Sequence, residues 1–265
     1  MSFRITTWNV NSVRLRIDLV KRILTELKPD LLCLQEIKVD TPLFPAEPLA
    51  EIGYAHQAVS GMKGYNGVAI LARKPFAGKD TLDWCDKTDS RHIWCALANG
   101  IEVHNIYVPS GGDVPDPEEN DKFAHKLRFL DEVTSWFGGA RKPSKPMILV
   151  GDLNIAPLEH DVWSHKQLLD VVSHTPIEVE KLTAMQRGLG WVDAVRHFVP
   201  ASEKLYTWWS YRAHDWQVSN RGRRLDHVWV TKPLAKSLER AEVLARARGW
   251  EKASDHVPVT VELDL

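Results

Sequence analysis

Apolar residues recur along the chain at two spacings, one typical of strands and one typical of helices. Residues 3–8 alternate between apolar and polar positions, and residues 31–34 form a short apolar run, so a strand is predicted at each. Between them, apolar residues within 15–27 recur every three or four positions before Pro29, which predicts a helix. A second helix is predicted over residues 121–137. Further strands are predicted over residues 67–72, 93–98, 101–107, 147–150, 225–230 and 257–263.

Strands and helices alternate over the whole length of 265 residues, without a composition change that would mark a second domain. Residues 160–200 are predicted to contain helices and loops. Residues 110–120 are polar and rich in Gly and Pro, which predicts a surface loop. The pattern therefore predicts one α/β domain with mixed sheets, spanning residues 1–265.

Composition narrows the class of protein. Hydrophobic residues make up 44% and charged residues 26%, as in ordinary globular proteins, and the formal net charge is −1. This balance argues against a protein that coats nucleic acid non-specifically, although it is compatible with a local basic groove. The chain contains 11 Trp residues, and core packing is the favoured interpretation for each one alone.

The cysteines and the apolar segments indicate in which cellular compartment the protein is expected. Cys33, Cys85 and Cys95 form no CxxC motif and leave one residue over, so neither a disulfide framework nor a zinc site is predicted. The N-terminal residues lack the apolar segment of a signal peptide, and no apolar run is long enough to span a bilayer. We therefore expect a soluble cytoplasmic protein without a membrane partner.

One apolar strand ends in an unusual way. The segment MILVGDLNIAP, residues 147–157, begins as a buried strand and then places Asp152 and Asn154 two positions apart before a proline. Because successive residues of a strand face opposite ways, an extended backbone would aim both side chains at one point. The spacing predicts that the carboxylate and the carboxamide act together.

Other predicted strands also begin or end with polar side chains that carry chemistry. These residues are Asn9, Glu36, Tyr107, Asp226, Asp255 and His256. Asn and Asp are common in turns, which is the alternative interpretation for each of them alone. Glu36 is harder to explain in that way, because Glu favours neither turns nor strand ends. Their occurrence in segments spread over the whole chain indicates one site built from strand ends.

The residue types at these strand ends favour a divalent cation. Convergent carboxylates raise one another's pKa and destabilise the fold, so a cation between them gives a reason for the arrangement. Glu36, Asp255 and the Asn9 amide offer hard oxygen ligands, which suit Mg²⁺. The set contains a single His and no Cys, which argues against zinc. We therefore expect Mg²⁺, with Mn²⁺ as a substitute.

Six motifs carry a resemblance to a known family. They are WNVNSVR (8–14), LQEIK (34–38), YVP (107–109), GDLN (151–154), RLDH (224–227) and SDHVPV (254–259). Together and in this order they resemble the exonuclease III type of abasic-site endonuclease, which belongs to the endonuclease/exonuclease/phosphatase superfamily. The resemblance covers essentially the whole chain. It implies an α/β fold, a four-layer α-β-β-α sandwich of two mixed β-sheets flanked by helices, with the active site at one edge.

The resemblance also implies roles for the residues at the strand ends. Glu36 would be the principal metal ligand, and Asp152 would orient or deprotonate the attacking water. Asn154 would hydrogen-bond the phosphate or the water and stabilise developing charge. His256 would contact the scissile phosphate, and Asp226 would bond its other ring nitrogen and so fix the orientation of the ring.

Tyr107 completes the residues implied for catalysis, because it would bind the phosphate or help to stabilise the leaving 3′-oxygen. The number of metal ions stays open, since Asp152 and Asn154 could form a second, transient metal site. The residues implied for metal binding are Asn9, Glu36, Asp152, Asn154, Asp255 and His256.

Three features favour DNA as the substrate. Lys38 lies just beyond Glu36, residues 206–212 resemble the family's DNA-facing aromatic loop, and residues 220–226 place three arginines beside Asp226. Aromatic rings can fill a gap in a base stack while arginines bind phosphates. The alternative is that the tryptophans belong to the core and the arginines to a solvated turn. With a loop at 63–67 included, the predicted DNA contacts are Lys38, Lys63, Tyr65, Asn66, Trp208, Trp209, Arg212, Arg221, Arg223 and Arg224.

The resemblance implies a Mg²⁺-dependent phosphodiesterase of base-excision repair. Such an enzyme would cut duplex DNA 5′ to abasic sites, with some 3′→5′ exonuclease and 3′-phosphatase activity, and its partner would be DNA with abasic or 3′-blocked sites. Ser110 and Arg223 depart from the family pattern, which leaves the balance of these activities open. The alternatives are the same chemistry on RNA or a phosphorylated small molecule, and a non-catalytic DNA-binding protein. A monomer is the default expectation.

Overall fold

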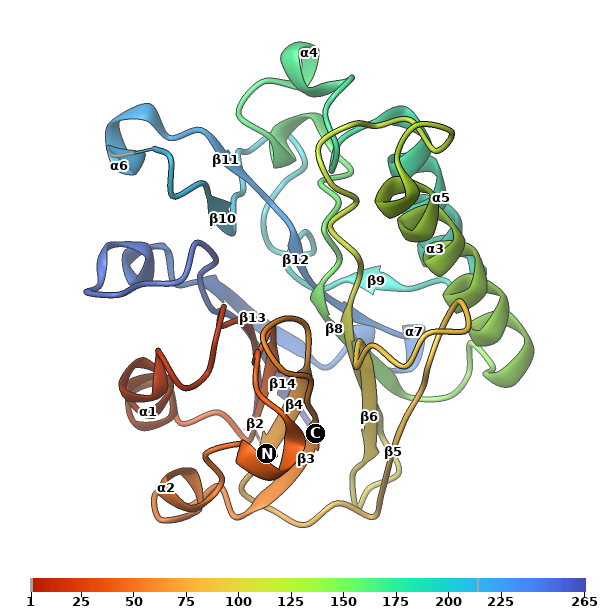
Figure 1. Cartoon of the computed structure of the whole chain (residues 1–265). Helices are drawn as coiled ribbons and strands as arrows, with labels where there is room; N and C mark the ends of the chain where they lie inside the picture. Colours follow the sequence, from red (N-terminus) through yellow and green to blue (C-terminus); the bar gives the residue numbers. More distant parts are fainter. Residues whose placement is uncertain (1, 214) are drawn as a thin grey trace.

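Two six-stranded β-sheets pack face to face, with helices on the outer face of each sheet (Figure 1). The structure is a computed structural model and describes residues 2–213 and 215–265. The strands of the first sheet lie in the order β13-β14-β1-β2-β4-β3, and those of the second in the order β5-β6-β7-β8-β12-β9. Both sheets are mixed, because β1 and β2, and likewise β7 and β8, pair in parallel among antiparallel neighbours. The predicted α/β sandwich is confirmed.

The first sheet consists of β1 (Ser2–Asn9), β2 (Leu31–Gln35), β3 (His56–Ser60), β4 (Val68–Ala72), β13 (Leu238–Val243) and β14 (Val259–Asp264). The second consists of β5 (Gly78–Thr81), β6 (His92–Ala96), β7 (Glu102–Tyr107), β8 (Met147–Asp152), β9 (Val192–Asp193) and β12 (Asp226–Val230). A small ribbon pairs β10 (Trp208–Trp209) with β11 (Gly222–Arg223).

The helices are α1 (Ile17–Glu26), α2 (Glu47–Ala50), α3 (Asp121–Ala140), α4 (His165–Leu168), α5 (Pro176–Gly188), α6 (Trp216–Ser219) and α7 (Lys232–Ala235). Short 3₁₀ helices span Thr41–Leu43, Glu159–Asp161 and Ala245–Gly249. Within the described part of the chain, no helix has both the length and the apolar character that a membrane span requires.

Apolar side chains fill the spaces on both faces of each sheet. One cluster lies between the two sheets and includes Val103 of β7 and Val261 of β14. A second cluster packs Ile23 of α1 against the outer face of the first sheet. A third packs Phe129 of α3 against Leu149 of β8. Because the central strands are covered on both faces, they form nearly continuous apolar runs in the sequence.

The predicted elements are present, with shifted ends. α1 begins at Ile17 rather than at residue 15, and Leu15 is 57% exposed, so it lies in the turn before the helix. α3 continues to Ala140 rather than residue 137, and its first turn is capped by Asn120, whose side chain accepts a hydrogen bond from the backbone N–H of Lys122. β3, β5 and β13 were not predicted because they lie at sheet edges, where most side chains are half-buried or exposed.

Strand register brings the polar strand ends to one edge of the sandwich. β7 and β8 pair so that Tyr107 lies beside Asp152, and β12 pairs with β8 so that Asp226 lies on the other side of Asp152. In the first sheet, β1 ends at Asn9 and its parallel neighbour β2 ends one residue before Glu36. The pairing of the strands therefore determines which distant residues meet.

Candidate active site

The Asn9 amide joins the ends of the two sheets. Its Nδ2 donates to Glu36 Oε1 at 2.8 Å and to Asp152 Oδ2 at 2.9 Å. The hydroxyl of Tyr107 donates to the same Glu36 oxygen at 2.9 Å. Asn9 and Asp152 are fully buried, and Tyr107 is 7% exposed. Burial raises the pKa of Tyr107 well above its ordinary value, so its hydroxyl stays a donor. Four of the predicted residues are thus in one hydrogen-bonded group.

Glu36 adopts an unusual backbone conformation. Its φ is +50°, a region that bulky side chains rarely occupy. The conformation is held by neighbouring segments, since the N–H of Ser12 donates to the Glu36 carbonyl at 2.7 Å and the N–H of Ile37 donates to Gly67 at 3.1 Å. The Lys38 ammonium lies 2.7 Å from Glu36 Oε2. Burial alone would raise the pKa of Glu36, but Lys38 and the Asn9 amide lower it below the ordinary value.

Asp152 and Asn154 meet through a turn rather than through strand alternation. β8 ends at Asp152, and Asn154 has a φ of +52°. The N–H of Asn154 donates to Asp152 Oδ1 at 2.9 Å, and its side-chain amide donates to Asp152 Oδ2 at 3.2 Å and to the Val108 carbonyl at 2.9 Å. Gly151, with φ +141°, permits close strand contact, because a Cβ there would lie 1.9 Å from the Ile106 carbonyl oxygen. The expected convergence is present, but the extended backbone predicted for it is wrong.

Asp226 orients His256. Asp226 Oδ2 lies 2.8 Å from His256 Nδ1, which leaves Nε2 directed towards Asp152, with 3.6 Å between Nε2 and Asp152 Oδ2. The Thr207 hydroxyl donates to Asp226 Oδ2 at 2.6 Å and so fixes the carboxylate. Burial would lower the pKa of His256, but Asp226 and Asp152 raise it, which keeps the ring protonated. Burial raises the pKa of Asp152, and the protonated His256 beside it opposes this rise.

Asp255 precedes His256 in the sequence, and each oxygen of its carboxylate accepts a side-chain hydrogen bond. Its Oδ2 accepts a hydrogen bond from Trp208 Nε1 at 2.9 Å, and its Oδ1 accepts one from Asn11 Nδ2 at 3.1 Å. Burial would raise the pKa of Asp255, but His256 and these donors lower it. Asp255 is therefore a carboxylate at neutral pH, with lone pairs left for a further ligand.

The donor set fits a divalent cation. Asp152, Asp226 and His256 each offer a ligand atom, and these atoms lie within 4.8 Å of one another. His256 can offer only its Nε2, however, because its Nδ1 is already bonded to Asp226. Glu36 is the better candidate, since its pKa is lowered and it is a carboxylate at neutral pH, and a bound cation would displace the Lys38 ammonium that lies 2.7 Å from Oε2. Asp226 Oδ1 is also buried without a hydrogen-bond partner among the described residues.

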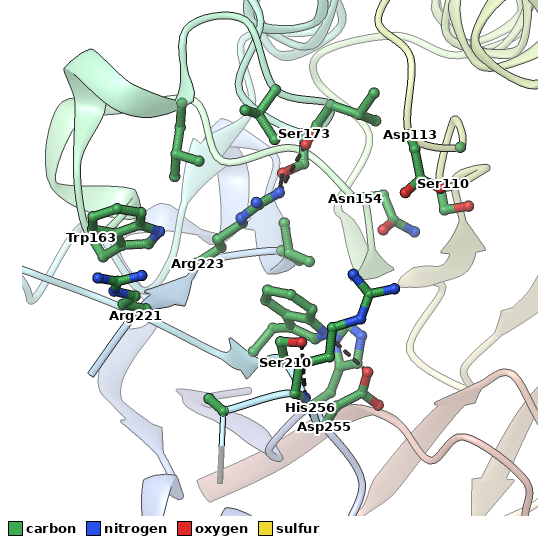
Figure 2. A pocket seen from close by; sticks show the side chains of 18 of the residues that line it. Ser110, Asp113, Asn154, Trp163, Ser173, Ser210, Arg221, Arg223, Asp255 and His256 are labelled. Carbon is green, nitrogen blue, oxygen red and sulfur yellow. Dashed lines mark hydrogen bonds between the residues drawn. The ribbon is translucent and has the colours of Figure 1, made fainter. Parts of the chain in front are cut away.

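A cavity of about 880 Å³ opens beside these residues. Its floor includes Glu36, Tyr107 and His256, and one wall is formed by residues of the β10–β11 ribbon and the loop before α5. Figure 2 shows Asn154 and His256 bordering this space, with Arg223 extending towards Ser173. The arrangement places acidic and cationic groups at the base of an open cleft, which suits a charged and bulky ligand.

The model of the endonuclease/exonuclease/phosphatase family matches residues 6–256. The chain belongs to this family. It is 34% identical to an AP endonuclease from Archaeoglobus fulgidus, over 99% of this chain and 100% of that one, with a TM-score of 0.93. It is 32% identical to the 3′-5′ exonuclease NExo from Neisseria meningitidis, over 99% of this chain and 100% of that one, with a TM-score of 0.90. Exodeoxyribonuclease III from Haemophilus influenzae is 27% identical over 97% of this chain and 98% of its own.

These relationships confirm the family predicted from the six motifs. A further structure describes NExo from Neisseria as a 3′ phosphatase bound to a product DNA hairpin. That protein is 32% identical to this chain, which covers it completely.

Three of the predicted DNA contacts belong to the interior. Arg224 is 1% exposed and its guanidinium binds two carboxylates, those of Asp161 and Asp193. Trp209 is 4% exposed and packs in the core beside the first sheet. Asn66 is 4% exposed, and its amide donates to a backbone carbonyl. Burial argues against DNA contacts by Arg224 and Trp209, whereas Asn66 also lines a cavity beside Tyr65 and Tyr107, so its contact with DNA stays a prediction.

Four other predicted contacts line the cavity: Trp208, Arg212, Arg221 and Arg223. The guanidinium of Arg221 lies over the ring of Trp163 at 4.7 Å, and that of Arg223 lies 5.4 Å from the ring of Trp208. Arg223 also donates to Ser173 Oγ at 2.7 Å. Ser110 lines the same cavity, as its position after the YVP motif suggests.

The remaining predicted contacts are Lys38, Lys63 and Tyr65, which are not among the residues that line this cavity. Lys38 is held between Glu36 and the Asn11 side chain. Lys63 and Tyr65 are exposed on the 63–67 loop, and Tyr65 borders a second cavity of about 560 Å³. This cavity shares Tyr107 and Ser110 with the first one and is lined by further basic residues, Lys87, Arg91 and Lys122.

Sequence reasoning did not identify Thr207, Trp163 or Ser173. Thr207 lies inside the aromatic segment 206–212, but its role follows only from its hydrogen bond to Asp226 in the structure. Trp163 and Ser173 lie in the 160–200 region, where no motif stood out. Their proximity to the cavity depends on how the loops before α4 and α5 fold back over β8 and β12.

Proposed function

We propose that this chain is a divalent-metal-dependent DNA phosphodiesterase of base-excision repair. It cuts duplex DNA 5′ to abasic sites, and it also removes 3′-terminal nucleotides and 3′ phosphates. The observation that carries the proposal is the placement of Asp152, Glu36 and the Asp226–His256 pair around one cavity floor. The named activities of its relatives, an AP endonuclease, a 3′-5′ exonuclease and a 3′ phosphatase, support the same reaction class.

Different side chains have different roles in the proposed hydrolysis. Asp152 accepts a proton from the attacking water as the water oxygen bonds phosphorus, and its raised pKa suits a general base near neutral pH. The P–O3′ bond breaks, and the leaving 3′-oxygen takes up a proton. The protonated His256, held by Asp226, would lie next to the phosphate oxygens of a bound substrate and stabilise their negative charge.

Asn154 and Tyr107 would contribute neutral donors to the same phosphate, in exchange for their present hydrogen bonds to Asp152 and Glu36. The Tyr107 hydroxyl keeps its proton at all physiological pH values because its pKa is raised by burial. Glu36, Asn9 and Asp255 would hold the metal ion, which supplies positive charge to the phosphate oxygens when it is bound. Oxygen donors of this kind favour Mg²⁺, with Mn²⁺ as an alternative.

The wall of the cavity supports DNA as the substrate. Trp208 and Trp163 offer aromatic faces, and Arg212, Arg221 and Arg223 offer positive charge along the same wall. A nucleotide that is displaced from a base stack, as at an abasic site or a frayed 3′ end, can place its sugar and phosphate against such a surface. We expect the protein to act as a monomer on double-stranded DNA inside the cell.

A panel of substrates tests the proposal. Purified protein is incubated with an abasic duplex, a nicked duplex, a duplex with a 3′ phosphate, an undamaged duplex and an RNA duplex, each with Mg²⁺, Mn²⁺ or EDTA. We expect cleavage of the first three with either metal and none with EDTA. Cleavage of RNA alone would support the same chemistry on another substrate. Binding of DNA without cleavage under any of these conditions would contradict the proposed function.

A further inference from the structure

A buried lysine lies behind the active site. Lys126 is on the inner face of α3 and is completely buried, so its ammonium cannot reach solvent. The ammonium lies 2.5 Å from Glu178 Oε1, 2.8 Å from the Asn154 carbonyl oxygen and 3.3 Å from the Ser110 carbonyl oxygen. An ammonium in such a place is costly unless each of its donors finds an acceptor. All three acceptors here belong to segments that surround the cavity.

Glu178 extends the contacts of Lys126 to a third loop. It lies in the first turn of α5 and is completely buried. Its carboxylate accepts hydrogen bonds from the Ser173 N–H at 2.9 and 3.0 Å and from the Thr175 hydroxyl at 2.7 Å. Ser173 in turn accepts a hydrogen bond from Arg223, which lines the cavity. One ion pair therefore connects the loops that carry Ser110, Asn154 and Ser173.

The backbone at Asn154 is the segment that most needs this support. Its φ of +52° is held at the N–H by Asp152 Oδ1 and at the carbonyl by Lys126. If the carbonyl lost its donor, the peptide after Asn154 would be free to rotate towards a more common conformation. The Asn154 amide and the Asp152 carboxylate would then lose their mutual hydrogen bonds. The Ser110 loop packs on the same lysine, since a Cβ at Gly111 would lie 2.9 Å from Lys126 Cδ.

We infer that Lys126, paired with Glu178, is a positioning residue that holds Asn154, and through it Asp152, in the geometry needed for hydrolysis. This inference rests on the proposed function, because the placement of Asn154 matters only if the site cleaves a phosphodiester. The competing explanation is that the pair stabilises the core and has no separate influence on the reaction. The two explanations differ in what they predict for kcat in a protein that remains folded.

The first experiment compares Lys126→Met and Lys126→Arg with a matched control, Glu102→Gln. Glu102 is a buried carboxylate that binds Arg141 and Lys145 far from the cavity residues in the fold. The full-length variants are assayed on whichever substrate of the panel the wild type cuts, at a temperature where circular dichroism shows each to be folded. We expect Lys126→Met to lower kcat by about 10- to 100-fold with KM changed less than about threefold. Lys126→Arg should restore most of kcat, and Glu102→Gln should leave it unchanged.

The second experiment tests whether Lys126 acts through Asn154. The variants Asn154→Ala and Lys126→Met are combined, and kcat is measured for each single and for the double variant. If the lysine works by placing Asn154, the double variant should be within about twofold of Asn154→Ala alone. Losses that multiply, or a Lys126→Met enzyme with wild-type kcat, would overturn the inference.

The experiments also distinguish a variant that does not fold from a wild type that is inactive. If Lys126→Met does not fold, Lys126→Gln replaces it in every comparison, because its amide keeps most of the volume and two N–H donors but loses the charge. If the wild type cuts none of the substrates, the proposed function fails and this inference fails with it. If the wild type cuts and the folded lysine variants cut equally well, only the inference fails.

Discussion

Two clusters of buried charged residues differ in how their charges are balanced. In the first, Arg224 forms two hydrogen bonds of 2.9 Å with Asp161 and one of 2.6 Å with Asp193. Arg196 contributes a second cation to Asp161. These carboxylates raise the pKa of Arg224 above its ordinary value, and the arginine lowers that of Asp193. Each charge has a partner of the opposite sign, and the cluster has no access to solvent at its centre.

The second cluster, at the floor of the cavity, has a surplus of acid. Asp152 and Asp226 are completely buried and share the single imidazolium of His256. Asp226 Oδ1 has no hydrogen-bond partner among the described residues. Burial raises the pKa of Asp152. A cluster of this kind is not explained by stability, because unpaired buried charge destabilises a fold. The difference indicates that the first cluster serves the structure and the second serves the reaction.

Removing Arg224 is expected to have the largest effect on stability. Arg224→Met leaves two buried carboxylates without their main partner, so the free energy of unfolding should fall by about 3–5 kcal/mol. Denaturant unfolding measures the change. As a control, Arg240→Met removes an arginine whose side chain is 62% exposed, and it should change the same quantity by less than about 0.5 kcal/mol. If both substitutions changed the free energy of unfolding by equally small amounts, the Arg224 cluster would not be a stabilising one, and the two clusters would not differ in this respect.

Changing Asp226 is expected to affect the reaction rather than the stability. Asp226→Asn keeps the size of the side chain but no longer holds the proton at His256 Nδ1, so kcat should fall about 100-fold. Thermal unfolding should change little, because the substitution also removes a buried charge with an unsatisfied oxygen. A steady-state assay with unfolding curves checks both results. Strong destabilisation with unchanged kcat would show that Asp226 stabilises the fold and is not needed for the reaction.

A smaller, pH-dependent effect is expected at Glu102, which binds Arg141 and Lys145. Burial would raise the pKa of Glu102, but hydrogen bonds from His104, Lys145 and Arg141 lower it to about 2 from 4.5. Since the folded-state pKa is the lower one, this stabilisation is complete above pH 4.5 and is lost as the pH falls through 2. Unfolding free energies measured from pH 6 to pH 2 (roughly the range over which carboxylates titrate) should fall less steeply for Glu102→Gln. If the unfolding free energies of the wild type and Glu102→Gln fell in parallel with pH, Glu102 would not be the source of this pH dependence.

The smallest effect is expected at the rim of the cavity. Arg221 is exposed and stacks on Trp163, so Arg221→Ala should raise KM for DNA by about two- to fivefold without changing kcat. The dependence of binding on salt should also weaken, since one phosphate contact is lost. Fluorescence anisotropy at several salt concentrations measures this change. An unchanged salt dependence would show that Arg221 does not contact the DNA backbone.

The sequence was sufficient to predict the strand ends that form the site, for a physical reason. Central strands buried on both faces are continuous apolar runs, so a polar residue such as Glu36 or Asp152 at the end of one is conspicuous. Edge strands lack this contrast, and β3, β5 and β13 were missed for that reason. The backbone at Glu36 and Asn154 could not be predicted, because hydrogen bonds from distant segments hold their positive φ angles.

For the neighbouring residues Arg223 and Arg224, the local sequence does not predict which side chain is buried. Both are predicted to contact DNA, but Arg223 ends β11 and Arg224 is the first residue after it. Arg223 faces the cavity, whereas Arg224 faces Asp161 and Asp193 in the interior. Which of the two points inwards depends on the register of β11 against β10 and on the position of the loop that carries Asp161. Neither is encoded within a few residues of the arginines.

The most direct test of one catalytic centre is single-turnover cleavage of an abasic duplex by the wild type and by Asp152→Asn, with the dissociation constant for the same DNA measured in parallel. We expect the substitution to slow cleavage by about 1,000-fold while DNA affinity stays within about threefold, because the general base is lost and the binding wall is intact. Cleavage by the variant at the rate of the wild type would contradict this expectation.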